Sequence, residues 1–218
     1  MILYTPPVDT GLNIIYQDEY IIVLNKPPGL LSVPGRGVDK QDCLVSRVLM
    51  EYPMALIVHR LDMSTSGIIV LALNQKIQRL LNTLFAARAI DKKYIAVVDG
   101  IIETRNDEIN KPLICDWPNR PKQIVDENHG KASLTRFNVI SIFKDSNISR
   151  VELMPTTGRT HQLRVHMHYI GHAILGDELY ASEAVANKSD RLLLHATEMK
   201  FTHPITGGEL ILKSPAPF

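Results

Sequence analysis

Apolar residues in this chain follow two spacings, and each spacing predicts one kind of element. Alternating or continuous apolar runs of four to ten residues predict strands. The predicted strands are 14–16, 20–24, 56–58, 67–73, 92–98, 134–143, 149–154, 190–196, 199–203 and 209–212. The run 67–73 is almost wholly apolar, which is typical of a central strand covered on both faces.

Apolar residues three or four positions apart predict three helices. The first follows a cap at Asp42 and ends before Pro53. Its expected buried residues are Leu44, Val45, Val48 and Leu49. The second is capped by Asn74 and buries Ile77, Leu80, Leu81, Leu84 and Phe85. The third begins after a cap at Thr160 and ends near Ile170, before Gly171.

The order of these elements predicts one α+β domain spanning residues 1–218. Most predicted strands neighbour another strand in sequence, helices are fewer, and no repeat or linker appears. We therefore expect a mostly antiparallel mixed β-sheet flanked by helices. The prolines and glycine of 25–29 must end the second strand and leave Lys26 at its end. Residues 112–122 contain too many prolines to predict a regular element.

Composition places the chain among globular proteins of a reducing compartment. The 218 residues are 45% hydrophobic and 22% charged, and no apolar run approaches the roughly 20 residues that span a bilayer. The N-terminus lacks a leader pattern, so we expect a cytoplasmic protein with no membrane contact. Cys43 and Cys115 lack metal-ligand spacing and are expected as free thiols. His166 and His168 point to different sides of the third helix, which excludes a metal site.

The segment 59–67 is the strongest candidate for chemistry. It connects two predicted strands and contains a Ser/Thr/Gly cluster, which predicts a tight connection. Arg60 and Asp62 would then be held on a short loop anchored at both ends, with His59 bracing the loop by hydrogen bonding. The alternative is an ordinary turn in which Asp62 accepts only local amide hydrogen bonds.

Two short basic segments are candidates for contact with nucleic acid. The whole-chain charge of +1 gives no such signal. Residues 111–122, however, place the only tryptophan, Trp117, beside Arg120 and Lys122, and an exposed aromatic beside bases suits stacking on unpaired bases. Residues 158–168 contain Arg159 and Arg164 without an acid. The alternatives are a tryptophan that pins its own loop to the core and ordinary solvated lysines and arginines.

Together the motifs resemble the RluA family of RNA pseudouridine synthases. They follow the family's order over nearly the whole chain: Asn25-Lys26-Pro27 with Gly29-Leu30, His59-Arg60-Leu61-Asp62 with Thr65-Ser66-Gly67, Lys93-Tyr94, Gly158-Arg159-Thr160-His161-Gln162-Leu163-Arg164 with His166, and Leu193-Leu194-His195-Ala196. The segment 113–123 looks like the loop of one subgroup, the ribosomal large subunit pseudouridine synthases A, whose substrates are ribosomal and transfer RNA. Larger relatives carry an N-terminal S4 RNA-binding module, which we do not expect here.

The resemblance implies an isomerase that cleaves the N1–C1′ bond of a uridine in RNA, rotates the uracil and rejoins it through C5, with no cofactor or metal. Asp62 would be the catalytic carboxylate, Arg164 its ion-pair partner and Tyr94 the aromatic against the uracil. Arg60 would contact RNA or occupy the space of the flipped base. The other expected RNA contacts are Trp117, Arg120, Lys122, Arg159 and His161.

The resemblance also implies the partner, which is structured RNA. The expected substrates are stem-loops of large-subunit ribosomal RNA and the transfer RNA anticodon arm, because unpaired loops make extrusion of a base easier. We expect a monomer. Two rival functions remain: a hydrolytic glycosidase, which usually needs a second carboxylate, and a non-catalytic RNA-binding or assembly factor on the same fold. How a carboxylate would act is also open, at C1′ or at C6 of the base.

Overall fold

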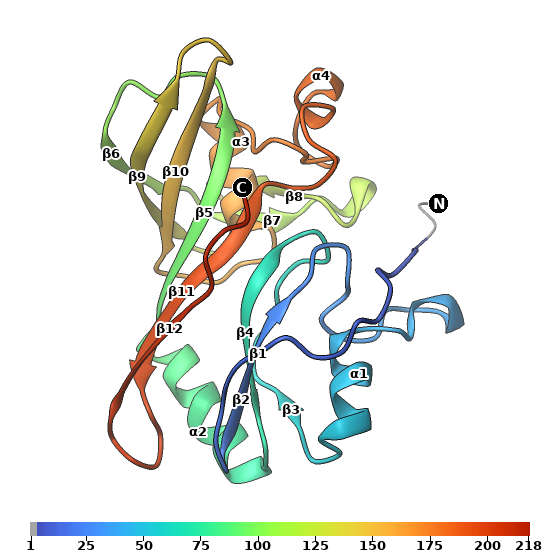
Figure 1. Cartoon of the computed structure of the whole chain (residues 1–218). Helices are drawn as coiled ribbons and strands as arrows, with labels where there is room; N and C mark the ends of the chain where they lie inside the picture. The colour runs from blue at the N-terminus through green and yellow to red at the C-terminus, as the bar shows by residue number, and fades with distance from the viewer. Residues whose placement is uncertain (1–3) are drawn as a thin grey trace. The chain divides into compact units, whose positions relative to one another are not determined.

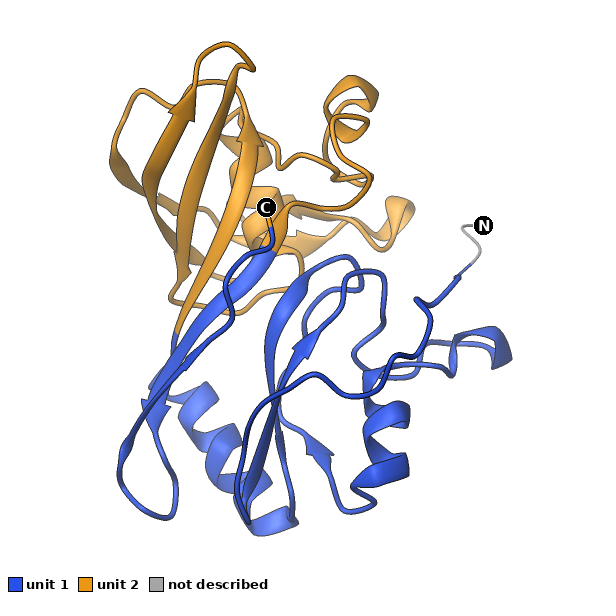
Figure 2. Ribbon diagram, in the orientation of Figure 1, with its two compact units in different colours: residues 1–91, 195–217 blue, residues 92–194, 218 orange. Residues whose placement is uncertain are grey.

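The structure, a computed structural model, describes residues 4–218 (Figure 1). The chain divides into two compact units (Figure 2): unit 1 holds residues 1–91 and 195–217, and unit 2 holds residues 92–194 and Phe218. The chain passes from unit 1 to unit 2 within strand β5 (Asp91–Asp99) and returns within β11 (Leu194–Thr202). One domain over residues 1–218 stays a prediction.

The sheet of unit 1 is built around β4 (Ser66–Ala72), whose residues are all buried. Its strand order is β1-β2-β4-β11-β12, and β3 also pairs with β4. The other strands are β1 (Ile14–Gln17), β2 (Ile21–Lys26), β3 (Leu56–Ile57) and β12 (Glu209–Lys213). Among the described strand pairs of unit 1, only β4–β11 is parallel. The predicted central strand is thus confirmed. The predicted strands 190–196 and 199–203 belong to one strand, β11, which begins only at Leu194, so the predicted start at 190 is wrong.

Two α-helices and a short 3-10 helix, η1 (Val38–Lys40), complete unit 1. Helix α2 (Gln75–Ala86) begins as predicted, with Asn74 Oδ1 accepting a hydrogen bond from Ile77 N at 3.0 Å. Helix α1 (Leu44–Glu51) is capped by Cys43, so the predicted cap at Asp42 is wrong. Asp42 instead accepts a hydrogen bond from Arg47 Nε at 2.8 Å, and this ion pair lets Arg47 take a buried position. Leu49 is exposed.

The main sheet of unit 2 is antiparallel throughout, in the order β5-β10-β9-β6. Its further strands are β6 (Asn106–Asn110), β9 (Leu134–Phe143) and β10 (Ile148–Pro155). One face carries a buried cluster that includes Ala96, Val98, Val151, Leu153 and Met167. The predicted 134–143 strand is confirmed to the residue, and with the sheet of unit 1 it confirms the α+β class with a mostly antiparallel mixed sheet.

The proline-rich segment of unit 2 forms a small hairpin, which the sequence did not predict. Strand β7 (Leu113–Cys115) pairs with β8 (Gln123–Val125), and the 3-10 helix η2 (Trp117–Asn119) lies between them. The prolines at 112, 118 and 121 all lie outside the two strands. They therefore remove no ladder hydrogen bond, which is why the two three-residue strands form.

Helix α3 (Gln162–Tyr169) begins later than predicted, and α4 (Glu183–Ala186) was not predicted. The predicted cap at Thr160 is wrong, because His161 occupies the cap position with φ 54° and makes no capping hydrogen bond. The side chain of Gln162 holds this turn instead, accepting hydrogen bonds from Arg159 N at 3.0 Å and Thr157 Oγ1 at 2.7 Å. No helix in the described residues is long and apolar enough to cross a membrane.

Candidate active site

The loop of unit 1 that carries Asp62 is fixed on the N-terminal side of this residue. Asp62 is half-buried, and its carbonyl accepts a hydrogen bond from Thr65 N at 3.1 Å, which makes a tight turn. One hydroxyl group forms hydrogen bonds with both the backbone N–H and the carbonyl of the preceding residue, Leu61. Ser32 Oγ accepts from Leu61 N at 3.1 Å and donates to Leu61 O at 2.7 Å. The predicted tight connection is confirmed.

A fully buried lysine fixes the C-terminal side of Asp62. Lys26 Nζ donates hydrogen bonds to the carbonyls of Pro27 at 2.8 Å, Leu30 at 2.7 Å and Met63 at 3.0 Å. Gly29 N donates to the same Met63 carbonyl at 2.9 Å. Three acceptors use all three N–H bonds of an ammonium group, which satisfies most of what burial of a lysine demands. Asp62 therefore lies between two residues whose backbones are anchored.

His59 braces the start of this loop, as predicted. Its Nε2 accepts a hydrogen bond from Val70 N at 3.0 Å, and its ring lies against that of Phe85 with 4.8 Å between centroids. The next residue, Arg60, is exposed. The sequence thus places an exposed cation between a braced histidine and an anchored leucine, Leu61.

The end of the loop is fixed by close approach of two strands in unit 1. Gly67 of β4 has φ +112°, and a Cβ added there would lie 2.3 Å from the carbonyl oxygen of Ala196 in β11, so only glycine fits. The neighbouring pair, Ser66 Oγ and His195 Nδ1, is buried and hydrogen-bonded at 2.8 Å. The Ser66-Gly67 and His195-Ala196 motifs are therefore one structural feature, a parallel pairing in register.

In unit 2, Arg164 of α3 forms a buried bidentate pair with Asp177. Arg164 Nε donates to Oδ2 at 2.8 Å and Nη2 donates to Oδ1 at 2.6 Å, and both side chains are almost inaccessible. Asp177 Oδ1 also accepts hydrogen bonds from the backbone N–H groups of Leu179 and Tyr180. The sequence reasoning missed Asp177. The predicted pairing of Arg164 with Asp62 stays a prediction.

Tyr180 connects several of the predicted residues of unit 2. The guanidinium carbon of Arg164 lies 5.2 Å from the centre of its ring. The Tyr180 hydroxyl accepts a hydrogen bond from Gln123 N at 2.8 Å and is hydrogen-bonded to His161 Nδ1 at 2.7 Å. His161, an expected RNA contact, is therefore half-buried with one ring nitrogen bonded inside the protein. Tyr180 was missed because no motif distinguished it from other tyrosines.

The remaining candidates of unit 2 differ in exposure. Tyr94 is half-buried on β5, opposite Leu153 of β10. Arg159 is exposed and its Nε donates to Ala132 O at 3.2 Å. In the hairpin, Trp117 is 64% exposed and the guanidinium of Arg120 lies over its ring at 4.8 Å. The alternative of a tryptophan pinned to the core is wrong.

Metal-binding side chains are not gathered anywhere in the described part of the chain: it holds no group of three or more His, Cys, Asp or Glu suited to an ion. Cys43 and Cys115 are free cysteines, as expected. The side chain of Cys43 caps α1, so at least this thiol has a structural role.

Residues 20–169, which include the Asp62 loop, Tyr94 and Arg164, match the family model described as RNA pseudouridylate synthase. The chain belongs to this family. It is 49% identical over 215 residues to the dual-specificity RNA pseudouridine synthase RluA of Salmonella typhi, covering 99% of this chain and 98% of the relative. The RluA of Escherichia coli K12 is 48% identical over the same shares of both chains.

A third relative and a solved structure agree with this placement. The RluA of Vibrio cholerae is 48% identical over 201 residues, 92% of this chain and 81% of the relative. Human RNA pseudouridylate synthase domain containing 1 superposes with a TM-score of 0.81 at 28% identity, covering 98% of this chain and 87% of that one. This RNA pseudouridylate synthase is thus an isomerase that converts uridine in RNA to pseudouridine, as the resemblance implied.

Proposed function

We propose that Asp62 is the carboxylate that catalyses uridine isomerisation. The observation that supports this most directly is the anchoring of the loop on both sides of Asp62, by Ser32 at Leu61 and by Lys26 at Met63. Such anchoring holds a reacting group in place, so that the loop loses little conformational entropy when substrate binds.

The proposed reaction requires an ionised carboxylate and a flipped base. Cleavage of the N1–C1′ bond develops positive charge at C1′, which Asp62 would stabilise, or Asp62 would attack at C1′ or at C6 of the uracil. The uracil then rotates and bonds to C1′ through C5, so that the RNA keeps its mass. In this proposal Tyr94 lies against the uracil, Arg164 supports the charge of Asp62, and Arg60 contacts RNA or replaces the extruded base.

We propose stem-loops of large-subunit ribosomal RNA and the transfer RNA anticodon arm as substrates. The chain is 48–49% identical to dual-specificity RNA pseudouridine synthases over 99% of its length, which supports more than one RNA substrate. An unpaired loop lowers the energy needed to extrude the target uridine. In the same proposal, the protein acts in the cytoplasm as a monomer and needs no cofactor or metal.

The proposed contacts with the RNA outside the target base are exposed or half-buried cations and one aromatic ring. Exposed Trp117 with Arg120 offers a ring and a cation side by side, which suits an unpaired base and its phosphate. The remaining proposed contacts are Lys122, Arg159 and His161.

Replacement of Asp62 by asparagine tests the central assignment. We expect Asp62→Asn to lose at least 1,000-fold in pseudouridine formation, roughly the scale of removing a covalent or electrostatic catalyst, while its Kd for a transfer RNA anticodon stem-loop changes by less than about threefold. The matched control is Asp145→Asn, an exposed carboxylate in the β9–β10 turn, which should keep full turnover. Turnover by Asp62→Asn within about tenfold of the wild-type rate would contradict the assignment.

Mass spectrometry of the product separates the reaction from hydrolysis. Isomerisation leaves the RNA mass unchanged and releases no free uracil, whereas a glycosidase leaves an abasic site. Wild-type protein that bound the stem-loop and left both mass and pseudouridine content unchanged would instead act as a binding factor on that RNA.

A further inference from the structure

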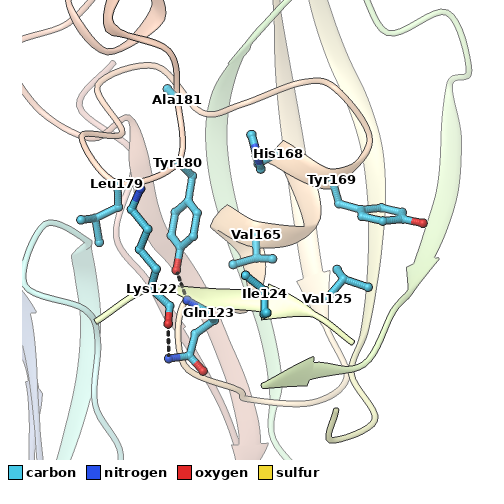
Figure 3. Close-up of a pocket in the computed structure, with 10 residues that line it drawn as sticks. All are labelled: Lys122, Gln123, Ile124, Val125, Val165, His168, Tyr169, Leu179, Tyr180 and Ala181. Atoms are coloured by element: carbon cyan, nitrogen blue, oxygen red, sulfur yellow. Dashed lines mark hydrogen bonds between the residues drawn. The ribbon is translucent and has the colours of Figure 1, made fainter. Parts of the chain in front are cut away.

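Unit 2 contains a pocket of about 470 Å³ that none of the three proposed catalytic residues lines (Figure 3). It lies between β8, α3 and residues 179–181. Tyr180 and His168 line it from the 179–181 segment and the helix, and Lys122 and Ile124 line it from the hairpin. Its volume falls within the range of sites for small ligands, roughly 300 to 1,000 Å³.

We infer that this pocket binds one unpaired nucleotide of the RNA substrate, a nucleotide other than the target uridine. The inference deepens the proposed function, because it rests on the proposal that the β7–β8 hairpin contacts RNA. It adds a place where a second base of the loop is held while the target base reacts.

The aromatic side chains of the pocket suit a nucleobase. Tyr180 is held by its hydroxyl contacts to Gln123 N and His161 Nδ1, so its ring is already ordered. Tyr169 lines the pocket as well and is 48% exposed. Stacking of a base on the exposed ring of Tyr169 would contribute about 1 to 3 kcal/mol to binding. Tyr180, which is only 9% exposed, supplies an ordered wall of the pocket.

The charges and hydrogen-bonding groups of the pocket suit the rest of a nucleotide. No Asp or Glu is among its lining residues in the described chain. Lys122 makes no ion pair with a described carboxylate, so its ammonium is available to a phosphate. The side chain of His168 makes a ring contact with Tyr180 but no hydrogen bond with a described residue, and its ring nitrogens can bond the edge of a base.

The hairpin connects this pocket to the exposed tryptophan. Arg120, which lies over Trp117, is only two residues before Lys122 and three before the start of β8 at Gln123. One short segment therefore presents an exposed ring and then a pocket, both with a cation. This succession is typical of proteins that track an unpaired strand base by base. A purely apolar ligand would offer no charged or hydrogen-bonding group to the side chains of Lys122 and His168.

A pair of matched variants tests the inference by binding alone. Ile124→Glu places a carboxylate at the pocket, whereas Ile140→Glu makes the same change on β9, away from it; the two isoleucines are 44% and 49% exposed. Both are made in the Asp62→Asn protein, and the Kd for an anticodon stem-loop is measured. We expect about a tenfold weaker Kd for Ile124→Glu and less than twofold for Ile140→Glu. Equal Kd values, weakened or not, would overturn the inference.

A fluorescent base identifies the nucleotide and separates this inference from the others. 2-Aminopurine replaces one unpaired loop nucleotide at a time, and stacking quenches it. We expect one position, not the target, whose quenching on binding is lost in Tyr169→Ala and in Ile124→Glu but kept in Ile140→Glu; a thermal melt confirms that each variant is folded. Quenching that Tyr169→Ala and Ile124→Glu both leave unchanged would overturn it. Near-wild-type turnover in Asp62→Asn would refute the catalytic assignment and leave this inference standing. Unchanged binding in Trp117→Ala would refute only the proposed contact of the tryptophan with RNA.

Discussion

The guanidinium of Arg164 is joined to the carboxylate of Asp177 by two hydrogen bonds of 2.8 and 2.6 Å, with 4% and 1% of the side chains exposed. Removing one member leaves the other buried without its bidentate partner. We therefore expect Arg164→Met and Asp177→Asn each to lower the free energy of unfolding by about 3 to 5 kcal/mol, measured by urea denaturation.

The control for this prediction is Arg136→Met. Arg136 is exposed on β9 and its Nε lies 3.5 Å from Glu108, so its loss should change stability by less than about 1 kcal/mol. A stability of Asp177→Asn equal to that of the wild type would show that the buried pair contributes nothing.

The predicted pairing of Arg164 with Asp62 needs its own test, because lost turnover in Arg164→Met also follows from the loss of Asp177's partner. We expect a double-mutant cycle of Asp62→Asn and Arg164→Met to give a coupling energy of at least about 0.5 kcal/mol in stability. The cycle of Asp62→Asn with Arg136→Met should be additive. Additivity in both cycles would argue that Asp62 and Arg164 do not interact.

Lys26 should be required for the geometry of the Asp62 loop. Lys26→Met keeps the volume but leaves the carbonyls of Pro27, Leu30 and Met63 without this donor. We expect a loss of roughly 3 kcal/mol or more in unfolding free energy, and a larger fall in kcat than in affinity for the stem-loop. Lys76→Met, at an exposed position of α2, is the control. A Lys26→Met protein with normal kcat would show that the loop does not depend on this anchor.

Stability should fall with acid partly because of His166. Burial lowers the pKa of this imidazole below 6.5, and the hydrogen bond to Lys111 O opposes the shift only in part. As the pH falls below about 6.5, the unfolded chain takes up this proton before the folded protein does, so stability falls by at most about 1.4 kcal/mol per pH unit until the folded pKa is reached.

Unfolding free energies between pH 5 and 7.5 check this prediction. The slope should be shallower in His166→Gln than in the wild type and unchanged in His129→Gln, whose side chain is 77% exposed. A wild-type slope that persists in His166→Gln would assign the acid sensitivity to other groups.

Reversing the charge of Arg120 should weaken RNA binding in a salt-dependent way. If its guanidinium contacts a phosphate, Arg120→Glu lowers the slope of log K against log salt by about one unit. Arg79→Glu, an exposed change of equal charge on α2, is the control. Titrations of the stem-loop at several salt concentrations measure both slopes, and equal slopes would remove Arg120 from the proposed interface.

The sequence predicted the elements whose signals are local. The apolar run 67–73 and the capping Asn74 indicated β4 and the start of α2 because periodicity and capping need only neighbouring residues. The predicted start of α3 was wrong because the side chain of Gln162, together with Thr157, replaces the expected cap. That interaction depends on backbone geometry that no spacing encodes.

The candidate site was predictable to the extent that its residues belong to recognisable motifs. Asp62, Tyr94 and Arg164 lie in such motifs, whereas Asp177 and Tyr180 follow α3 in a segment whose sequence shows no periodicity. The burial of Lys26 was equally hidden, because a lysine at a strand end is usually solvated. In each case the partner is distant in sequence or is a backbone carbonyl, which residue types alone do not reveal.

Tyr180 gives the inferred nucleotide pocket a thermodynamic link to the buried pair of α3. Its ring both lines the pocket and lies at 5.2 Å from the guanidinium of Arg164. A ligand that binds better when Arg164 and Asp177 hold this arrangement also stabilises the arrangement, because the coupling between the two is reciprocal. If Arg164 acts in the reaction as proposed, the identity of a base away from the target would influence turnover, which is selectivity exerted without contact to the uridine itself.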